Sequence, residues 1–200
     1  RTPMKTRTMR MNPAVHMLAL AAVLALGAPV IANAAVVSYT ATLSGTAESP
    51  PNASMGTGFA QVDIDPVAHT MNVFITFEGL SGVTTACHIH GPTTVAGTGT
   101  AGVATTTPTF PGFPAGVAAG MYDQLFDMTL TASFNGSFVA NNGGTAATAE
   151  AALFQAITDG KTYVNVHSNL FPGGEIRGFL TAAATPTDLS SWGQVKSLYR

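Results

Sequence analysis

Apolar and polar residues alternate along most of the chain beyond Val37. The clearest run covers residues 71–77, where Met71, Val73, Ile75 and Phe77 occupy every second position. A period of two is typical of β-strands with one face in a core, because successive side chains point to opposite sides. Similar runs cover residues 37–43, 60–64, 83–90, 126–132, 161–167 and 175–181.

Gly and Pro residues separate these runs at intervals of roughly ten residues, which indicates turns between antiparallel strands. The Asp-Pro step at Pro66 predicts a hairpin between the runs at 60–64 and 71–77. The stretch 110–120 is rich in Pro and Gly and predicts a long surface loop. The Ala-rich stretch 146–157 has apolar residues at helical spacing and predicts a short helix. The pattern therefore predicts an all-β fold, an antiparallel Greek-key-like β-sandwich or barrel with one short helix.

The first 34 residues have the layout of a secretory signal peptide. A positive start that includes Lys5 and Arg7 precedes an apolar run at 17–26, and small residues follow up to Ala34. The run is too short to span a bilayer as a mature helix. We expect cleavage after Ala34, no membrane span afterwards, and a secreted, periplasmic or extracellular product. A retained N-terminal anchor is the alternative.

The rest of the chain predicts one domain followed by a tail. Residues 35–182 hold all the strand patterns, and 183–187 have a linker composition. Residues 188–200 predict a short amphipathic helix that carries Trp192. This tail is interpreted either as a helix docked on its own domain or frayed, or as a docking or sorting element for an unknown extracellular or envelope partner.

Charge and cysteine content exclude several classes of function. Residues 35–200 contain four basic and ten acidic residues, a formal charge of −6, which argues against nucleic acid and anionic membranes as partners. Cys87 is the only cysteine, so an intrachain disulfide is impossible. Its position in the strand pattern favours a small buried residue, with a metal ligand, a reactive thiol or an intermolecular disulfide as alternatives.

Chemically versatile side chains gather in three short segments, 87–92, 163–168 and 172–178. In an extended strand, residues two apart project to the same side. Each segment therefore places polar side chains on one face and apolar side chains on the other. These polar faces hold His88 and His90 in the first segment, Tyr163, Asn165 and His167 in the second, and Glu175 and Arg177 in the third.

Two interpretations of this polar cluster remain open from the residues alone. Three imidazoles at one place suit a copper or zinc ion, since neutral ring nitrogens bind such ions at about 2.0–2.1 Å. Alternatively, the imidazoles donate to backbone carbonyls or to a carboxylate such as Glu175 and lock the strands together. Arg177 then forms an ion pair with Glu175 or orients an anionic ligand.

Catalysis is not indicated by any motif of the chain. There is no Gly-x-Ser-x-Gly elbow, and Ser168 follows His167 directly, so the two would face opposite sides of a strand. The glycines at 97–102 do not lie between a strand and a helix, as a phosphate loop requires. We therefore expect no catalytic residues and favour a protein that is not an enzyme.

The chain resembles the CHRD domain family over roughly residues 38–182. The resemblance rests on Leu43-Ser44-Gly45 with Glu48 and Pro50-Pro51, on 56–65 and 77–80, on His-Ile-His-Gly-Pro at 88–92, and on 163–180. It implies an all-β, immunoglobulin-like or related sandwich whose molecular activity is poorly defined.

A weaker likeness connects the chain to the copper/zinc superoxide dismutase sandwich, in which His88, His90, His167 and Arg177 would be the counterparts. The zinc-loop histidines and aspartate of that family have no match here, and a single cysteine cannot form its disulfide. The resulting hypothesis is a secreted CHRD-domain protein, an extracytoplasmic binding or structural module. The alternative is a copper- or zinc-binding protein, which could be redox-active, with His88, His90 and His167 as ligands.

Overall fold

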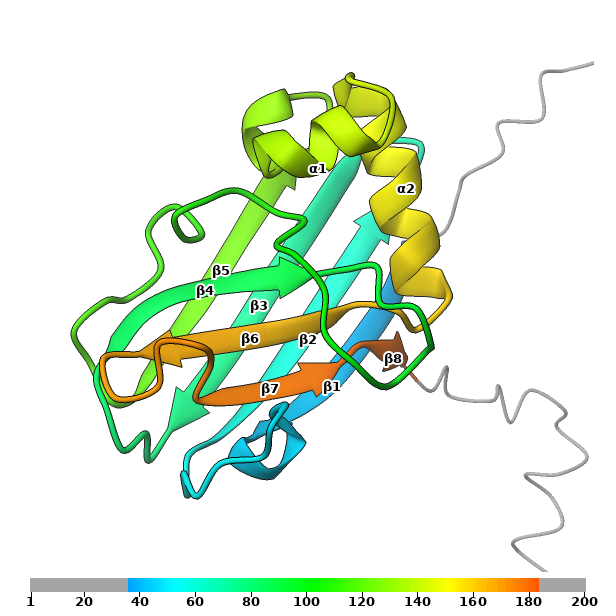
Figure 1. Cartoon of the computed structure of the whole chain (residues 1–200). Coiled ribbons are helices and arrows are strands. Elements are labelled where there is room, and N and C mark those ends of the chain that lie inside the picture. Colours follow the sequence, from blue (N-terminus) through cyan, green and yellow to red (C-terminus); the bar gives the residue numbers. More distant parts are fainter. Residues whose placement is uncertain (1–35, 184–200) are drawn as a thin grey trace, which may run out of the picture. The chain divides into compact units, whose positions relative to one another are not determined.

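The computed structural model describes residues 36–183, which form one strongly curled antiparallel sheet with helices at one end (Figure 1). The elements in chain order are β1 (Val37–Ser44), the 3₁₀ turn η1 (Gly45–Ala47), β2 (Thr57–Asp65), β3 (Thr70–Glu78), β4 (Thr84–His90), β5 (Gly120–Asp127), the 3₁₀ turn η2 (Thr131–Ser133), α1 (Gly136–Asn141), α2 (Ala146–Thr158), β6 (Tyr163–Ser168), β7 (Ile176–Phe179) and β8 (Thr181–Ala182).

The strands follow the order β4-β6-β7-β1-β2-β3-β5, and β8 pairs with β1. Strands β1, β2, β3 and β5 form a long limb with continuous registers, whereas β4, β6 and β7 form a short limb. The two limbs meet where β7 joins β1 through the single pair Ser44↔Arg177. Figure 1 shows the short limb crossing the long limb at an angle, so the sheet folds back over itself.

The prediction of a mostly β, antiparallel fold is confirmed, but the strands form one curled sheet where the pattern predicted a sandwich of two sheets. Gly178 explains how β7 can reach β1. A Cβ atom at this position would lie 2.3 Å from the carbonyl oxygen of Thr42, so only glycine permits this approach. The sequence pattern predicts which residues form strands. The close approach of Gly178 to Thr42, which that pattern does not predict, allows the two limbs to join in one sheet.

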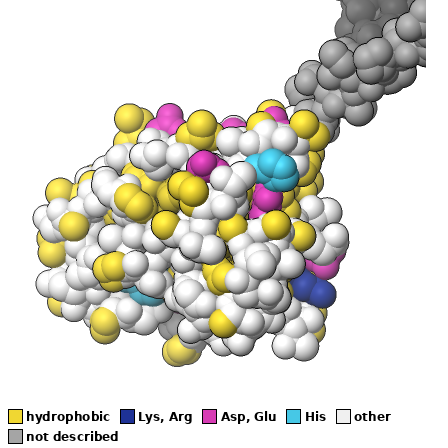
Figure 2. Space-filling view, turned by 90° about the horizontal axis from the view of Figure 1, so that it is seen from above, with side chains coloured by type: hydrophobic (Ala, Val, Ile, Leu, Met, Phe, Trp, Pro, Cys, Tyr) yellow, Lys and Arg dark blue, Asp and Glu magenta, His cyan; other side chains and the backbone are white. Residues whose placement is uncertain are grey.

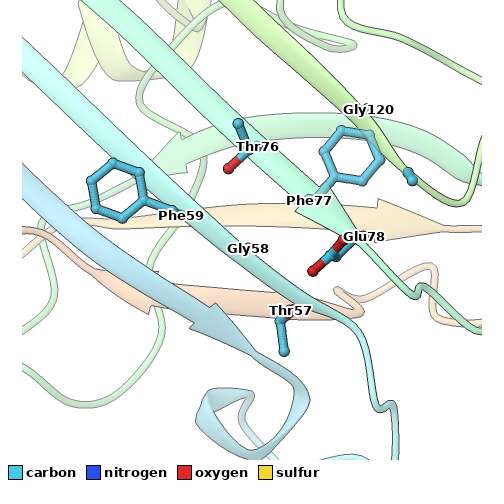
Figure 3. A pocket seen from close by; sticks show the side chains of 8 residues that line it. Thr57, Gly58, Phe59, Thr76, Phe77, Glu78 and Gly120 are labelled. Atoms are coloured by element: carbon cyan, nitrogen blue, oxygen red, sulfur yellow. The ribbon is translucent and has the colours of Figure 1, made fainter.

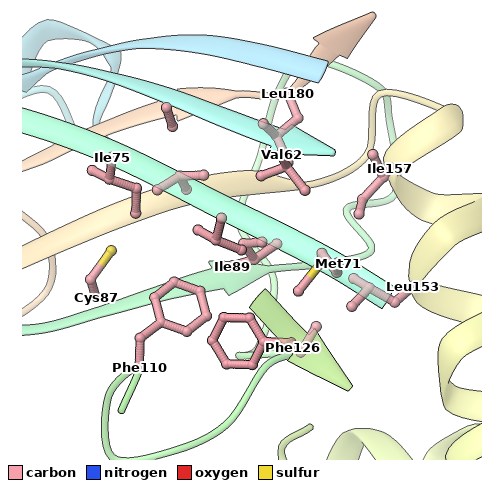
Figure 4. Close-up of a cluster of buried hydrophobic side chains, with 14 of the residues drawn as sticks. Val62, Met71, Ile75, Cys87, Ile89, Phe110, Phe126, Leu153, Ile157 and Leu180 are labelled. Atoms are coloured by element: carbon pink, nitrogen blue, oxygen red, sulfur yellow. The ribbon is translucent and has the colours of Figure 1, made fainter. Parts of the chain in front are cut away.

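The hydrophobic core lies between the two limbs. Met71 and Ile75 come from the long limb, Ile89 from the short limb, and Leu153 and Ile157 from α2, which closes one end (Figure 4). Alternate positions of each strand supply the core, as the sequence predicts. Cys87 lies in this core as a free, buried thiol, which confirms the prediction of a small buried residue.

Local predictions were confirmed at one helix and corrected at one strand. The helix expected over 146–157 is α2, whose first turn is closed by a capping box between Thr145 and Thr148. The strand expected over 126–132 was wrong in its bounds, because β5 ends at Asp127, whose carboxylate accepts a hydrogen bond from the next turn. The loop expected over 110–120 exists, but its Phe110 is fully buried in the core.

The predicted signal peptide, nearly all of the predicted linker and the tail with Trp192 lie outside the described residues. Within residues 36–183, no helix has the length and apolar character needed to cross a bilayer. The face of the domain in Figure 2 carries few charged side chains among many uncharged ones. This agrees with a charged content of 9% and makes each buried charge notable.

Candidate metal centre

Strands β4 and β6 bring the three predicted histidines together. Their antiparallel register places His88 opposite Asn165 and His90 opposite Tyr163, with His167 one step further along. All five side chains project from the side of the short limb opposite to the core. The ring centroids of the histidines lie 5.3 to 5.8 Å apart in the pairs His88–His90, His88–His167 and His90–His167.

Each imidazole uses one ring nitrogen to contact a backbone carbonyl. Because a carbonyl oxygen only accepts hydrogen bonds, the contacting nitrogen carries the proton of the neutral ring. The other ring nitrogen is then a lone pair, which is the form that binds metals. The contacts join His88 Nε2 to Pro108 O at 2.6 Å, His90 Nδ1 to Ala101 O at 3.0 Å and His167 Nδ1 to Pro172 O at 3.0 Å.

The second nitrogen of each ring has no hydrogen-bond partner among the described residues. These atoms are His88 Nδ1, His90 Nε2 and His167 Nε2, and all three are buried. One ring nitrogen of each histidine lies within 4.8 Å of one from each of the others. Tetrahedral ligation at about 2.0–2.1 Å needs nitrogens roughly 3.4 Å apart, so the rings would have to move closer together to share one ion.

The surroundings keep the imidazoles neutral. Burial lowers the pKa of His88 and of His167, and a contact of each ring with a carbonyl opposes this only in part. Burial also lowers the pKa of His90, to about 4, and the neighbouring rings and Arg177 act in the same direction. Neutral imidazole is the state that ligates copper and zinc, so at neutral pH the three rings are in the form that a metal site would require.

Two further members of the predicted polar cluster support the ring of His90. Tyr163 stacks on it with centroids 4.9 Å apart and planes 6° from parallel. The Tyr163 hydroxyl contacts the backbone of Ala101, the residue whose carbonyl also binds His90. Arg177 lies over the Tyr163 ring at 4.8 Å and donates to the carbonyl of Gly99 at 3.1 Å. These contacts hold the 99–101 loop against the histidines.

Glu48 is a residue near this site to which the sequence assigned no role beyond the family likeness. Its carboxylate lies 3.8 Å from the guanidinium of Arg177, and both side chains are buried. Burial raises the pKa of Glu48 to about 7, although Arg177 lowers it. Glu48 Oε1 and Asn165 Oδ1 are both buried without a partner among the described residues. A Cβ at Gly174 would contact both groups, so they lie around the same glycine.

Glu175 belongs to a different network, and no described contact joins it to Arg177. Its buried carboxylate accepts hydrogen bonds from Ser54 Oγ at 2.6 Å and from the amides of Ser81 and Gly82. Burial raises the pKa of this carboxyl, but the hydrogen bonds outweigh burial and hold the pKa below its usual range. The ionised carboxylate of Glu175 thus connects the loops that contain Ser54 and Ser81 to the start of β7.

The histidine cluster does not coincide with the pocket drawn in Figure 3. That pocket, of about 470 Å³, lies at the ends of β2, β3 and β5. Among its lining side chains, Glu78 is the only ionisable one, beside Thr57, Phe59, Thr76 and Phe77. Such a lining offers no constellation for ligating a metal or for acid–base chemistry. The histidine cluster of the short limb is therefore a separate place from this pocket.

Comparisons with known proteins identify the family. No curated protein and no solved structure matches the chain. The likeness to the copper/zinc superoxide dismutase sandwich thus stays an analogy drawn from the sequence. The family model of the CHRD domain matches residues 39–180, a span that includes most of β1, all of β2 to β7 and the three histidines of the cluster. Because this match covers more than half of the chain, the protein belongs to the CHRD domain family.

Proposed function

We propose that this CHRD domain is a metal-binding module in which His88, His90 and His167 hold one copper or zinc ion. Two observations carry the proposal: each of the three histidines keeps one buried ring nitrogen without a partner, and one ring nitrogen of each lies within 4.8 Å of one from each of the others. Each ring is oriented by a carbonyl contact on its other nitrogen. Metal-ligating histidines are typically oriented in this way.

A purely structural network accounts for only half of this arrangement. The carbonyl contacts lock β4 and β6 to the covering loops, as a structural role requires. They leave three unpartnered acceptors in one cluster of rings, and a buried acceptor without a donor costs about 1–3 kcal/mol. One water molecule has two protons, so it satisfies at most two of the three nitrogens. A metal ion accepts all three lone pairs at once.

The three-histidine set leaves one coordination position open. Metal sites with three protein ligands commonly keep a fourth position for water or another small ligand. His167 is the least buried of the three, so access to the ion is on its side of the cluster. The signal-peptide pattern of residues 1–34 supports an extracytoplasmic location for the module.

Elemental analysis and metal titration of the full chain test the proposal. We expect one equivalent of copper or zinc per chain, a raised melting temperature with metal, and loss of both in His88→Ala/His90→Ala. His69→Gln is the matched control, because His69 is half exposed and pairs with Glu150 instead. If no metal binds stoichiometrically and melting does not change with Cu²⁺ or Zn²⁺, the histidines form a structural network of a non-enzymatic binding or structural module.

A further inference from the structure

The ligand group of the proposed centre contains no anionic side chain. Within the described residues, no Cys, Asp or Glu offers an atom to the group of His88, His90 and His167. Cys87 points into the core on the other side of β4. Glu175 is occupied by Ser54 and two backbone amides. An ion in this site is therefore held by three neutral imidazoles, with no protein ligand to neutralise its charge.

Arg177 places a fixed positive charge beside the histidines. Tyr163 lies on the central strand β6, between His90 on β4 and Arg177 on β7. The stacking distances are 4.9 Å from His90 to Tyr163 and 4.8 Å from Arg177 to Tyr163. These distances put the guanidinium within about 10 Å of the His90 ring, and Arg177 is only 5% exposed. Arginine keeps its charge at all relevant pH values.

Glu48 compensates this charge only in part. Its carboxylate faces Arg177 from the η1 side at 3.8 Å. Burial raises the pKa of Glu48 to about 7, so at neutral pH the carboxyl is partly protonated. The surroundings of the centre are thus net positive, and they are buried, so water screens them weakly.

We propose, resting on the metal site proposed above, that the centre selects monovalent copper over divalent zinc and divalent copper. The cost of burying an ion rises with the square of its charge, and no anionic ligand offsets it here. The repulsion from Arg177 is twice as large for a dication. At an effective dielectric constant of about 20 and a separation of about 10 Å, the second charge lowers affinity roughly tenfold. Three imidazoles without a fourth protein ligand match the low coordination number that Cu⁺ accepts.

Competition titrations of the full chain test this selectivity. Cu⁺, kept reduced with ascorbate under nitrogen, is titrated against bathocuproine disulfonate, and Zn²⁺ against a chromophoric pyridylazo chelator. Cu⁺ is expected to bind at least about a hundredfold more tightly than Zn²⁺, from the Arg177 repulsion together with the burial cost. Tighter binding of Zn²⁺ overturns this inference and leaves the metal site standing. If neither ion binds, the proposed function itself is overturned.

Variants of Arg177 isolate the contribution of its charge. Arg177→Met is expected to raise Cu⁺ affinity roughly tenfold and Zn²⁺ affinity roughly a hundredfold, so the ratio of the two affinities narrows about tenfold. Arg177→Lys keeps the charge and is expected to keep the wild-type ratio of affinities. Lys161→Met is the control, since Lys161 is a partly exposed cation directed towards Asp159. If the ratio of Cu⁺ to Zn²⁺ affinity is unchanged in Arg177→Met, the charge of Arg177 does not cause the selectivity. If that variant does not fold, the ratio measured for the wild type still tests the selectivity.

Discussion

Tyr163 lies flat against His90, with ring centroids 4.9 Å apart and an interplanar angle of 6°. The two residues are direct cross-strand partners in β6 and β4. Stacked pairs of this kind stabilise a fold beyond the area they bury. Here the stack also fixes the plane of one candidate ligand ring, so it couples the stability of the short limb to the geometry of the metal site.

Removal of the Tyr163 ring tests this coupling. Tyr163→Ala is expected to lower the free energy of unfolding by about 3 kcal/mol, because a buried aromatic ring is lost, and to weaken metal binding as His90 loses its support. Tyr163→Phe keeps the stack and loses only the hydroxyl contacts with Ala101, so it should retain most of the metal affinity. Urea unfolding and metal titration measure both effects. Equal metal affinity in Tyr163→Ala and wild type would show that the stack on His90 does not contribute to metal binding.

Glu175 is expected to contribute strongly to stability and not to metal binding. Glu175→Gln places an amide NH₂ group among the donors of Ser54, Ser81 and Gly82. We expect a loss of about 2–4 kcal/mol in the free energy of unfolding, because charge-assisted hydrogen bonds are lost in a buried place. Glu78→Gln is the control, since Glu78 is exposed. A change in unfolding midpoint no larger than that of the control would contradict the role assigned to Glu175.

The metal-free domain should lose stability on acidification through its histidines. The folded-state pKa of His90 is about 4, below the usual 6.5, so between these values the unfolded chain binds more protons. The stability that neutral His90 contributes to the folded state is fully present above pH 6.5 and is lost as the pH falls to about 4. The lowered pKa of His90 makes this loss of stability roughly 3 kcal/mol. His88 and His167, whose pKa values are also lowered, act in the same direction.

Glu48 opposes this trend. Its folded-state pKa is raised from 4.5 to about 7, so its contribution is present below pH 4.5 and is lost as the pH rises to 7. Glu48→Gln removes the opposing group, and the variant should therefore lose more stability than wild type between pH 7 and 5. Urea unfolding of metal-free protein at several pH values measures the difference in slope. A flatter profile in the variant would show that Glu48 is ionised in the folded protein at low pH.

Gly178 should tolerate no side chain. Its Cβ would lie 2.3 Å from Thr42 O, a backbone atom of β1 close to the pair Ser44↔Arg177 that joins the two limbs. Gly178→Ala is expected to lower the free energy of unfolding by about 3 kcal/mol or more. Gly102→Ala is the matched control, because no atom lies within 4 Å of its Cβ position. Thermal unfolding of both variants tests the assignment, and equal stabilities would disprove the close approach.

Cys87 should behave as an inert core residue. Burial raises the pKa of its thiol far above the usual range, so little thiolate exists at neutral pH. A thiol reagent such as dithionitrobenzoate is expected to label the urea-unfolded chain and not the native one. Cys87→Ala should cost about 1 kcal/mol of stability and leave metal affinity unchanged, because the side chain faces away from the histidines. Rapid native labelling or lost metal binding would revive the ligand or reactive-thiol interpretation.

Much of the short limb could be predicted from local pattern. The period of two in residues 87–90 and 163–167 assigns His88 and His90 to one face, and Cys87 and Ile89 to the other, because strand geometry leaves only two sides. The helix at 146–157 was likewise visible from spacing. The same reasoning failed at β5, where the apolar residues beyond Asp127 belong to a turn and not to the strand.

The sequence by itself determined which side chains share a face, because side-chain direction in a strand depends only on the backbone repeat. Tertiary structure decided that β4 pairs with β6, that Arg177 faces Glu48 and not Glu175, and that three carbonyls leave one nitrogen of each histidine free. Arg177 and Glu48 lie far apart in the sequence, and the carbonyls that the histidines contact belong to loop backbone. No local pattern encodes the direction of a loop carbonyl, since it depends on how the loop packs over the finished sheet.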